Sequence, residues 1–266
     1  MSRYLCILGR FWKNSLLREM SFRGHFAVNV FGELLWVVLL LVFIDVIYSR
    51  TPDINGWTEA EYLFLTGTHL LVTGLFEAFF FENCWRISGL VRRGDLDFVL
   101  LKPANTQFLL SFQQISYSSL ANAPVGIGVC LYALRGDTQG VSAGQWGWFC
   151  VLVAAGVVVL YSVLFMFALT SVWLIRQTGV DHLWFYAVSL ARYPAEIYRR
   201  FVGGALYFSL VFVVPLLLVS NLPANVVVRT VEPWMVAYLL SATAVLLSLS
   251  GVVLRAALRS YRSASS

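Results

Sequence analysis

The chain has 266 residues, of which 59% are hydrophobic and only 12% are charged, and its formal net charge is +5. Soluble domains average about 45–50% apolar and about 25% charged residues, so a single water-soluble core of this length is excluded. A mean hydropathy of +0.75 favours an all-α, polytopic membrane protein. The basic residues lie between apolar blocks and form no stripe with interleaved aromatic residues, which argues against nucleic acid as a partner.

The first 24 residues predict an amphipathic helix that lies on the membrane surface. At about 100° per residue, apolar and polar side chains separate onto two sides, Leu5, Leu8, Trp12 and Leu16 against Arg3, Arg10 and Asn14. An apolar face in the acyl boundary and a basic face toward anionic headgroups are typical of an interfacial helix that binds membrane lipid. A flexible basic tail is the alternative. We expect no cleavable signal peptide, because no uninterrupted apolar core precedes His25.

Six apolar blocks follow, each close to the roughly 20 residues that a membrane-spanning helix needs. They cover residues 26–47, 62–81, 108–134, 146–175, 201–219 and 234–258. Pro124 predicts a kink in the third block. Of the 19 Lys and Arg residues, all but Arg50, Arg135 and Arg229 fall on one side of these six spans. Because basic residues collect in cytoplasmic loops, we expect both termini in the cytoplasm.

Three connecting segments have a composition of their own. Residues 83–105 are punctuated by Gly89 and Gly94 and reach Pro103, which predicts a short cytoplasmic helix; a solvated loop is the alternative. Residues 176–200 are too polar for a full span, so we place them along the cytoplasmic interface. Residues 215–233 carry three prolines among apolar residues and predict an outer re-entrant hairpin, which lipid tolerates only where protein shields the backbone.

Ionisable groups inside spans are costly and mark candidate functional positions. Glu33 lies in the first span, and His69, Thr73 and Glu77 follow at intervals of four residues in the second. This polar stripe is a candidate lining for a translocation path or a contact with a partner subunit. Structural hydrogen bonds between helices are the favoured alternative.

The chain contains none of the short motifs that carry catalysis or nucleotide binding. It has no GxxxxGK[ST], HExxH, GxSxG or paired CxxC, so we expect no catalytic, cofactor-binding or metal-binding residue. If ATP drives this protein, another chain binds it. Cys130 and Cys150 flank a predicted outer loop; a disulfide is one alternative there, and free thiols are favoured.

Two stretches resemble the permease subunit of bacterial type-2 ATP-binding-cassette (ABC) exporters. Residues 90–110, LVRRGDLDFVLLKPANTQFLL, are similar to a segment R-x-G-x-L-D-x-x-L-L-x-P of a permease subfamily. The stretches ARYPAEIYRR and VVPLLLVSNLPANVV resemble two further segments of that subfamily. The resemblance covers essentially the whole chain, including the surface helix, the six spans and the outer hairpin.

The resemblance implies a permease of the bacterial inner membrane that pairs with a second, different permease chain and with cytoplasmic ATPase subunits, which bind ATP and Mg. It also implies that residues 83–105 hold a coupling helix that docks the ATPase. The implied polar contacts are Arg86, Arg92, Arg93, Asp95 and Asp97, and the implied packing contacts are Leu96, Phe98 and Leu100. A structural membrane subunit and a gradient-driven secondary transporter are the alternatives.

Overall fold

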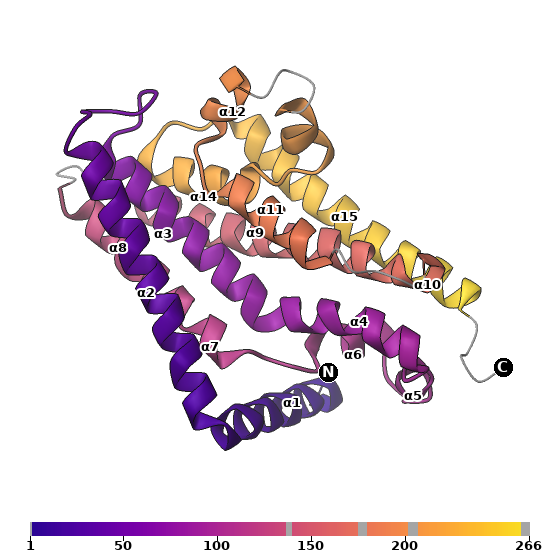
Figure 1. Ribbon diagram of the computed structural model, residues 1–266. Helices are drawn as coiled ribbons and strands as arrows, with labels where there is room; N and C mark the ends of the chain where they lie inside the picture. Colours follow the sequence, from indigo (N-terminus) through magenta and orange to yellow (C-terminus); the bar gives the residue numbers. More distant parts are fainter. Residues whose placement is uncertain (1, 137–139, 175–179, 202–206, 262–266) are drawn as a thin grey trace.

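The computed structural model describes residues 2–136, 140–174, 180–201 and 207–261, and the regular elements within these ranges are helices (Figure 1). Helix α1, Ser2–Ser21, spans most of the stretch in which we expect an amphipathic helix, and it runs crosswise to α2, Arg23–Tyr48. Leu5, Trp12 and Leu16 stay exposed on α1. The apolar face of α1 is therefore only partly covered by the rest of the chain: Leu8 is partly buried, and the Trp12 ring lies beside Phe79.

Four of the six expected spans are long apolar helices. These are Arg23–Tyr48, Glu59–Arg93, Ala143–Leu174 and Pro233–Ser260, the last being α15. The second comprises α3 (Glu59–Phe76), the π-helical turn η1 (Glu77–Phe81) and α4 (Glu82–Arg93). The third comprises α9 (Ala143–Leu169) and α10 (Ser171–Leu174). Length and composition therefore define a multi-pass membrane protein with four candidate spanning helices.

The third expected span is not one helix. Residues 106–133 form three short helices, α6 (Thr106–Phe112), α7 (Tyr117–Leu120) and α8 (Asn122–Ala133), followed by η2 (Leu134–Gly136). The helical ladder breaks at residues 113–116, and Pro124 lies in the first turn of α8, just after the turn at Ala121 that separates α7 from α8. A proline fits there because the first N–H groups of a helix have no partner within the helix.

The fifth expected span, residues 201–219, is also wrong as a continuous helix. Residues 202–206 lie outside the described part of the chain. Beyond them, the π-helical turn η3 (Ser209–Val213) ends at Val214, whose backbone is extended. Before this stretch lie α11 (Val180–Ala191) and a short helix that ends at Phe201, and α14 (Leu218–Val228) begins at its end.

The segment at residues 176–200, which we expected along the cytoplasmic interface, runs along the other helices in its described part. Helix α11 leads from the α10 end of the molecule toward α12, Ala195–Phe201 (Figure 1). There the indole Nε1 of Trp57, in the loop between α2 and α3, donates to Glu196 Oε2 at 3.2 Å. This contact places α12 at the end opposite the turn after α4. Asp181 and Arg192 lower the hydropathy of the stretch, so a hydropathy window selects residues 201–219 instead.

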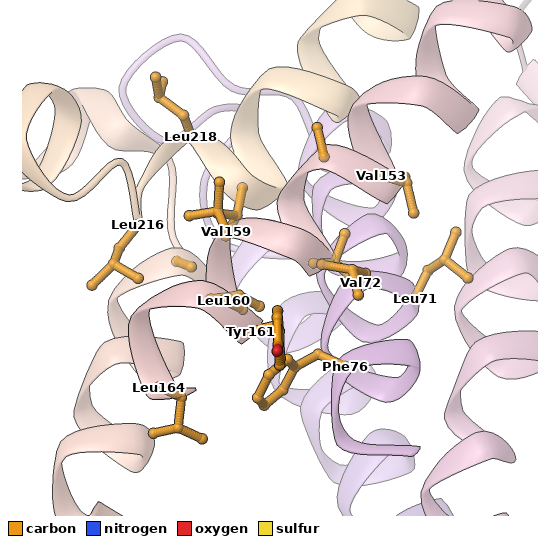
Figure 2. Close-up of a cluster of buried hydrophobic side chains, with 14 of the residues drawn as sticks. Leu71, Val72, Phe76, Val153, Val159, Leu160, Tyr161, Leu164, Leu216 and Leu218 are labelled. Atoms are coloured by element: carbon orange, nitrogen blue, oxygen red, sulfur yellow. The ribbon is translucent and has the colours of Figure 1, made fainter. Parts of the chain in front are cut away.

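The core lies where α3, α9 and the start of α14 meet. Figure 2 shows buried side chains from this region, among them Phe76 of α3, Leu160 of α9 and Leu216 just before α14. Phe76 and Leu160 are almost completely buried. Helix α14 is buried along most of its length although Pro223 lies inside it. The predicted re-entrant segment is thus a short helix that is shielded by protein.

Helices α3 and α8 approach closely at two glycines. A Cβ on Gly126 would lie 2.6 Å from the carbonyl oxygen of Gly67 and 2.8 Å from the backbone nitrogen of Leu71. Backbone atoms cannot move aside as a flexible side chain can. We therefore expect Gly126→Ala to lower the free energy of unfolding by about 1–3 kcal/mol, the usual cost of overpacking.

Thermal unfolding of the purified protein in detergent checks this expectation. Gly128→Ala is the matched control, because a Cβ at Gly128, in the same helix, meets nothing within 4 Å. Equal unfolding temperatures for the two variants would contradict the close approach of α3 and α8.

Candidate functional site

The segment at residues 83–105 forms a protruding corner of the molecule (Figure 1). Helix α4 ends at Gly94, whose φ of 74° lies in the left-handed region that glycine adopts without strain. Helix α5, Leu96–Leu100, follows at once. Gly94 therefore turns the chain as expected, whereas Gly89 lies within α4 and Pro103 follows the end of α5.

The rest of the chain leaves several apolar side chains of this corner uncovered. Phe98 is 67% exposed and Leu101 is 80% exposed, with Leu100 partly exposed beside them. Leu96 is only 2% exposed and packs inside the chain, as does Val99. Leu96 was expected to contact a partner, and its burial corrects that expectation. Instead, Leu96 anchors α5, and Leu101 takes its place on the exposed face.

Charged groups surround this apolar tip. Arg93 Nε forms an ion pair with Asp95 Oδ2 at 2.8 Å, both side chains being largely exposed, so the pair contributes little stability. Arg92 is exposed and Arg86 is partly buried.

Burial and then the Asp97 carboxylate raise the pKa of the Tyr261 phenol. The end of α15 therefore lies beside α5, and both belong to the same end of the molecule.

The break at residues 113–116 is held by side chains from α1 and α4. Asn83 Nδ2 donates to Gln114 O at 2.7 Å, and Gln114 N donates to Asn83 Oδ1 at 2.9 Å. Ile115 N donates to Ser15 Oγ at 3.1 Å, and Tyr117 N donates to Glu19 Oε1 at 2.9 Å. Side chains thus satisfy backbone groups that a continuous helix would have satisfied itself.

The polar stripe of α3 separates into different environments. His69 Nδ1 lies 3.2 Å from Ser220 Oγ of α14, so this pair joins two helices. Thr73 Oγ1 donates to the carbonyl oxygen of His69 at 2.7 Å, within its own helix. Glu77 lies one turn further on, at a groove beside α2. The described contacts of the stripe are therefore one contact between helices at His69 and one bond within α3 at Thr73, and Glu77 lines a groove.

Asn221 was not singled out from the sequence. Its Oδ1 accepts from Ala195 N at 3.0 Å, and its Nδ2 donates to Tyr193 O at 3.1 Å. Two of the stretches that carry the family resemblance meet here. Asn221 belongs to VVPLLLVSNLPANVV, and Tyr193 and Ala195 belong to ARYPAEIYRR. The structure thus brings the two stretches together at one turn.

Glu33 and Glu77, on different helices, line the same groove. This groove has a volume of about 630 Å³ and runs between α2, η1, α4 and α7. Asn122 Nδ2 donates to Glu33 Oε2 at 3.1 Å. Glu82 also lines the groove and forms an ion pair with Arg18 at 3.1 Å.

The cysteines do not form the alternative disulfide. Cys130 is buried, Cys150 is exposed, and both are free thiols. Among the described residues, no three His, Cys, Asp or Glu side chains gather as metal ligands.

The helical architecture, the apolar spans and the surface helix define a multi-pass membrane protein. Within that class, the family model for the ABC-2 family transporter protein matches residues 34–265, so the chain belongs to this family and is a permease subunit of an ABC transporter. Membership implies association with an ABC ATPase. Comparisons with curated proteins and with solved structures gave no match.

Proposed function

We propose that this chain is the membrane-spanning permease of an ATP-driven exporter in a bacterial inner membrane. The chain supplies half of a translocation path, and a second permease chain supplies the other half. A separate cytoplasmic ATPase binds ATP and Mg and hydrolyses the nucleotide. This chain contributes no catalytic residue of its own.

The exposed apolar tip of α5 carries the proposal. Large apolar side chains rarely gather on a water-facing corner unless a partner covers them. Phe98 and Leu101 protrude at such a corner, with Arg92, Arg93 and Asp95 around them. An apolar centre with a charged rim is the arrangement of a protein docking site. We assign the docking site of the ATPase to this corner. From there, α4 transmits ATP-driven movement directly to α3, because the two helices are continuous.

The path of the chain supports six membrane crossings with both termini on the ATPase side. Helices α6–α8 form the third crossing in pieces, and α11 forms the fifth. Both α1 and the end of α15 lie at the same end as α5. Most basic residues also fall on that side, as expected for the cytoplasmic side.

Co-purification in mild detergent tests the docking site. We expect the doubly substituted chain Phe98→Asp, Leu101→Asp to lose the ATPase that co-purifies with the unaltered chain, because two carboxylates would be desolvated on docking. The control chain Phe98→Leu, Leu101→Met keeps the apolar surface and should retain the ATPase. Circular dichroism of both chains shows whether the fold is kept.

The alternatives predict different results. A structural subunit would purify without a stoichiometric ATPase at any detergent strength. A gradient-driven transporter would transport without ATP and would lose transport when Glu33 or Glu77 is neutralised. An ATPase that is retained equally by the aspartate and control chains would contradict the assignment of α5.

A further inference from the structure

The docking corner continues into the membrane-spanning part of the chain by two routes. On one side, α4 leads through the π-helical turn η1 to α3. On the other side, the chain after α5 leads through residues 101–105 to α6. A partner that moves α5 would therefore act on two separate elements, α4 and α6.

The route through α6 ends in a buried hydrogen-bond network at Tyr161 of α9. Gln107 Nε2, on α6, donates to the Tyr161 hydroxyl at 3.1 Å, and Ser111 Oγ, one turn further along α6, lies 2.6 Å from the same hydroxyl. Tyr161 is 6% exposed and Ser111 is 1% exposed, and Figure 2 shows Tyr161 within the buried cluster. Buried groups cannot exchange such partners for water, so these bonds fix α6 against α9.

The route through α4 reaches the ring of the same tyrosine. The ring centroid of Phe80, in η1, lies 4.7 Å from that of Tyr161 and 5.2 Å from that of Phe112 on α6. π-helical turns interrupt the regular bonding of an α-helix and are frequent at functional sites. The two routes therefore separate at the docking corner and meet again at Tyr161.

The network extends to α15 through the amide of Gln107. Gln107 Nε2 donates to Ser250 Oγ at 3.0 Å in addition to Tyr161. Ser250 is completely buried, and its hydroxyl donates to Leu247 O within α15. Only 11% of the spanning window of α15 is buried, so this helix faces largely outward. One side chain of α6 thus joins two spanning helices, α9 and α15.

Stability alone gives little reason for a polar network at this place. Replacing both partners of a buried hydrogen bond by apolar groups of the same shape can be nearly neutral. Hydrogen-bond networks and rigid helices that have two discrete arrangements can instead carry coupling between distant sites. A network that receives both routes from the docking corner and ends on a third helix has the geometry for such coupling.

We propose that Gln107 is a positioning residue that transmits movement of the docking corner to α9 and α15, through Tyr161 and Ser250. This role rests on the proposed function, because the docked ATPase supplies the movement. When α5 moves, α6 moves with it, and the bonds of Gln107 pass the shift to the two spanning helices. The end of α15, which lies beside α5, offers a competing route to the same helix.

A distance measurement across the chain tests this role. The chain, with its four cysteines replaced, carries spin labels at Val245 of α15 and Val38 of α2, which are 64% and 54% exposed. It is reconstituted into lipid nanodiscs together with the proteins that co-purify with it. The distance between the labels is measured with and without a non-hydrolysable ATP analogue. We expect the nucleotide to change this distance when Gln107 is intact.

Two variants break the network at different points. Gln107→Leu removes the bonds to both Tyr161 and Ser250, and Ser250→Ala removes only the bond that reaches α15. In each variant the nucleotide-dependent change in distance should be at least twofold smaller. Both chains should retain the ATPase, because Phe98 and Leu101 are unaltered.

Ser248→Ala is the matched control for Ser250→Ala. Both serines lie in α15 and donate to a carbonyl oxygen of their own helix, Ser248 to Ala244 O at 2.8 Å, but Ser248 is exposed. The control therefore loses the same kind of bond within the helix without touching Gln107. Its change in distance should equal that of the chain with both serines intact.

Three results would overturn the role of Gln107. The first is an unchanged distance response in both Gln107→Leu and Ser250→Ala, even with a lower unfolding temperature, as expected of a purely structural network or of movement through the end of α15. The second is an equal loss of response in Ser248→Ala. The third is a complex that retains the ATPase but shows no response with Gln107 intact. If no ATPase co-purifies, the proposed function fails, and the role of Gln107 fails with it.

Discussion

Asn83→Ala is expected to lower the free energy of unfolding by about 3 kcal/mol, which would make it one of the most damaging single truncations in the chain. Asn83 is 3% exposed and makes hydrogen bonds with both the N–H and the C=O of Gln114. It also donates to Phe79 O at 2.9 Å. Alanine would leave the N–H and C=O of Gln114 without these partners, in a region that excludes water.

Unfolding by sodium dodecyl sulfate or heat, followed by circular dichroism, measures the loss. Asn83→Asp keeps the acceptor for Gln114 N but turns a buried carboxylate oxygen toward Phe79 O and Gln114 O, so a loss at least as large is expected. Ser88→Ala is the control within α4, because the Ser88 hydroxyl makes only a long bond of 3.4 Å to its own helix. If Asn83→Ala unfolded together with Ser88→Ala, the broken span would be held by something other than Asn83.

The four long helices were predictable because each apolar run is continuous, and hydropathy measures only such continuity. The breaks in the third and fifth blocks were not predictable in this way. Nothing in the composition of residues 108–134 shows that Ser15, Glu19 and Asn83 satisfy a backbone interrupted at Gln114 and Ile115. These partners come from residues about 30 to 100 positions away, and only the folded chain brings them together.

The position of α12 shows a second limit of hydropathy. A window average favours residues 201–219 over the more polar residues around α11. The structure instead leads the chain through α11 and joins Glu196 to Trp57 at the opposite end. Hydropathy ranks segments one at a time, whereas Asn221 and Trp57 hold this segment through contacts with other parts of the chain.

The sequence predicted the position of the candidate docking segment, residues 83–105, but not which of its apolar side chains are exposed. Spacing alone could have separated its two faces, since Leu96 and Val99 lie three residues apart and are buried, while Phe98 and Leu101 have the same spacing and are exposed. Glu33 and Glu77 stood out as ionisable groups in apolar blocks. Their meeting in one groove depends on the break at α7, which the sequence does not show.

Arg229→Ala is expected to lower the free energy of unfolding by about 2 kcal/mol, because Arg229 joins three segments at the end opposite α5. Its guanidinium donates to Glu61 Oε1 at 3.1 Å and to Glu61 Oε2 at 3.0 Å, and it also donates to Gly56 O. The side chains of this ion pair are only 26% and 21% exposed. The guanidinium also lies 4.0 Å from the centroid of the Trp57 ring.

Loss of Arg229 would leave the Glu61 carboxylate without its cation and uncover one face of Trp57, which is completely buried. Trp57 is the residue that binds α12, so the effect should extend to that helix. Glu61 would still form the capping box with Thr58 at the start of α3, so α3 itself should remain helical.

A double-mutant cycle with Glu61→Gln and Arg229→Gln, measured by thermal unfolding, separates the ion pair from the stacking on Trp57. A coupling energy of about 1 kcal/mol or more is expected for a partly buried bidentate pair. Arg50→Ala is the control, an exposed arginine in the same loop region. If Arg229→Ala were no less stable than Arg50→Ala, the start of α3 and the end of α14 would be held together without this pair. The buried Trp57 and its bond to Glu196 would then carry the contact alone.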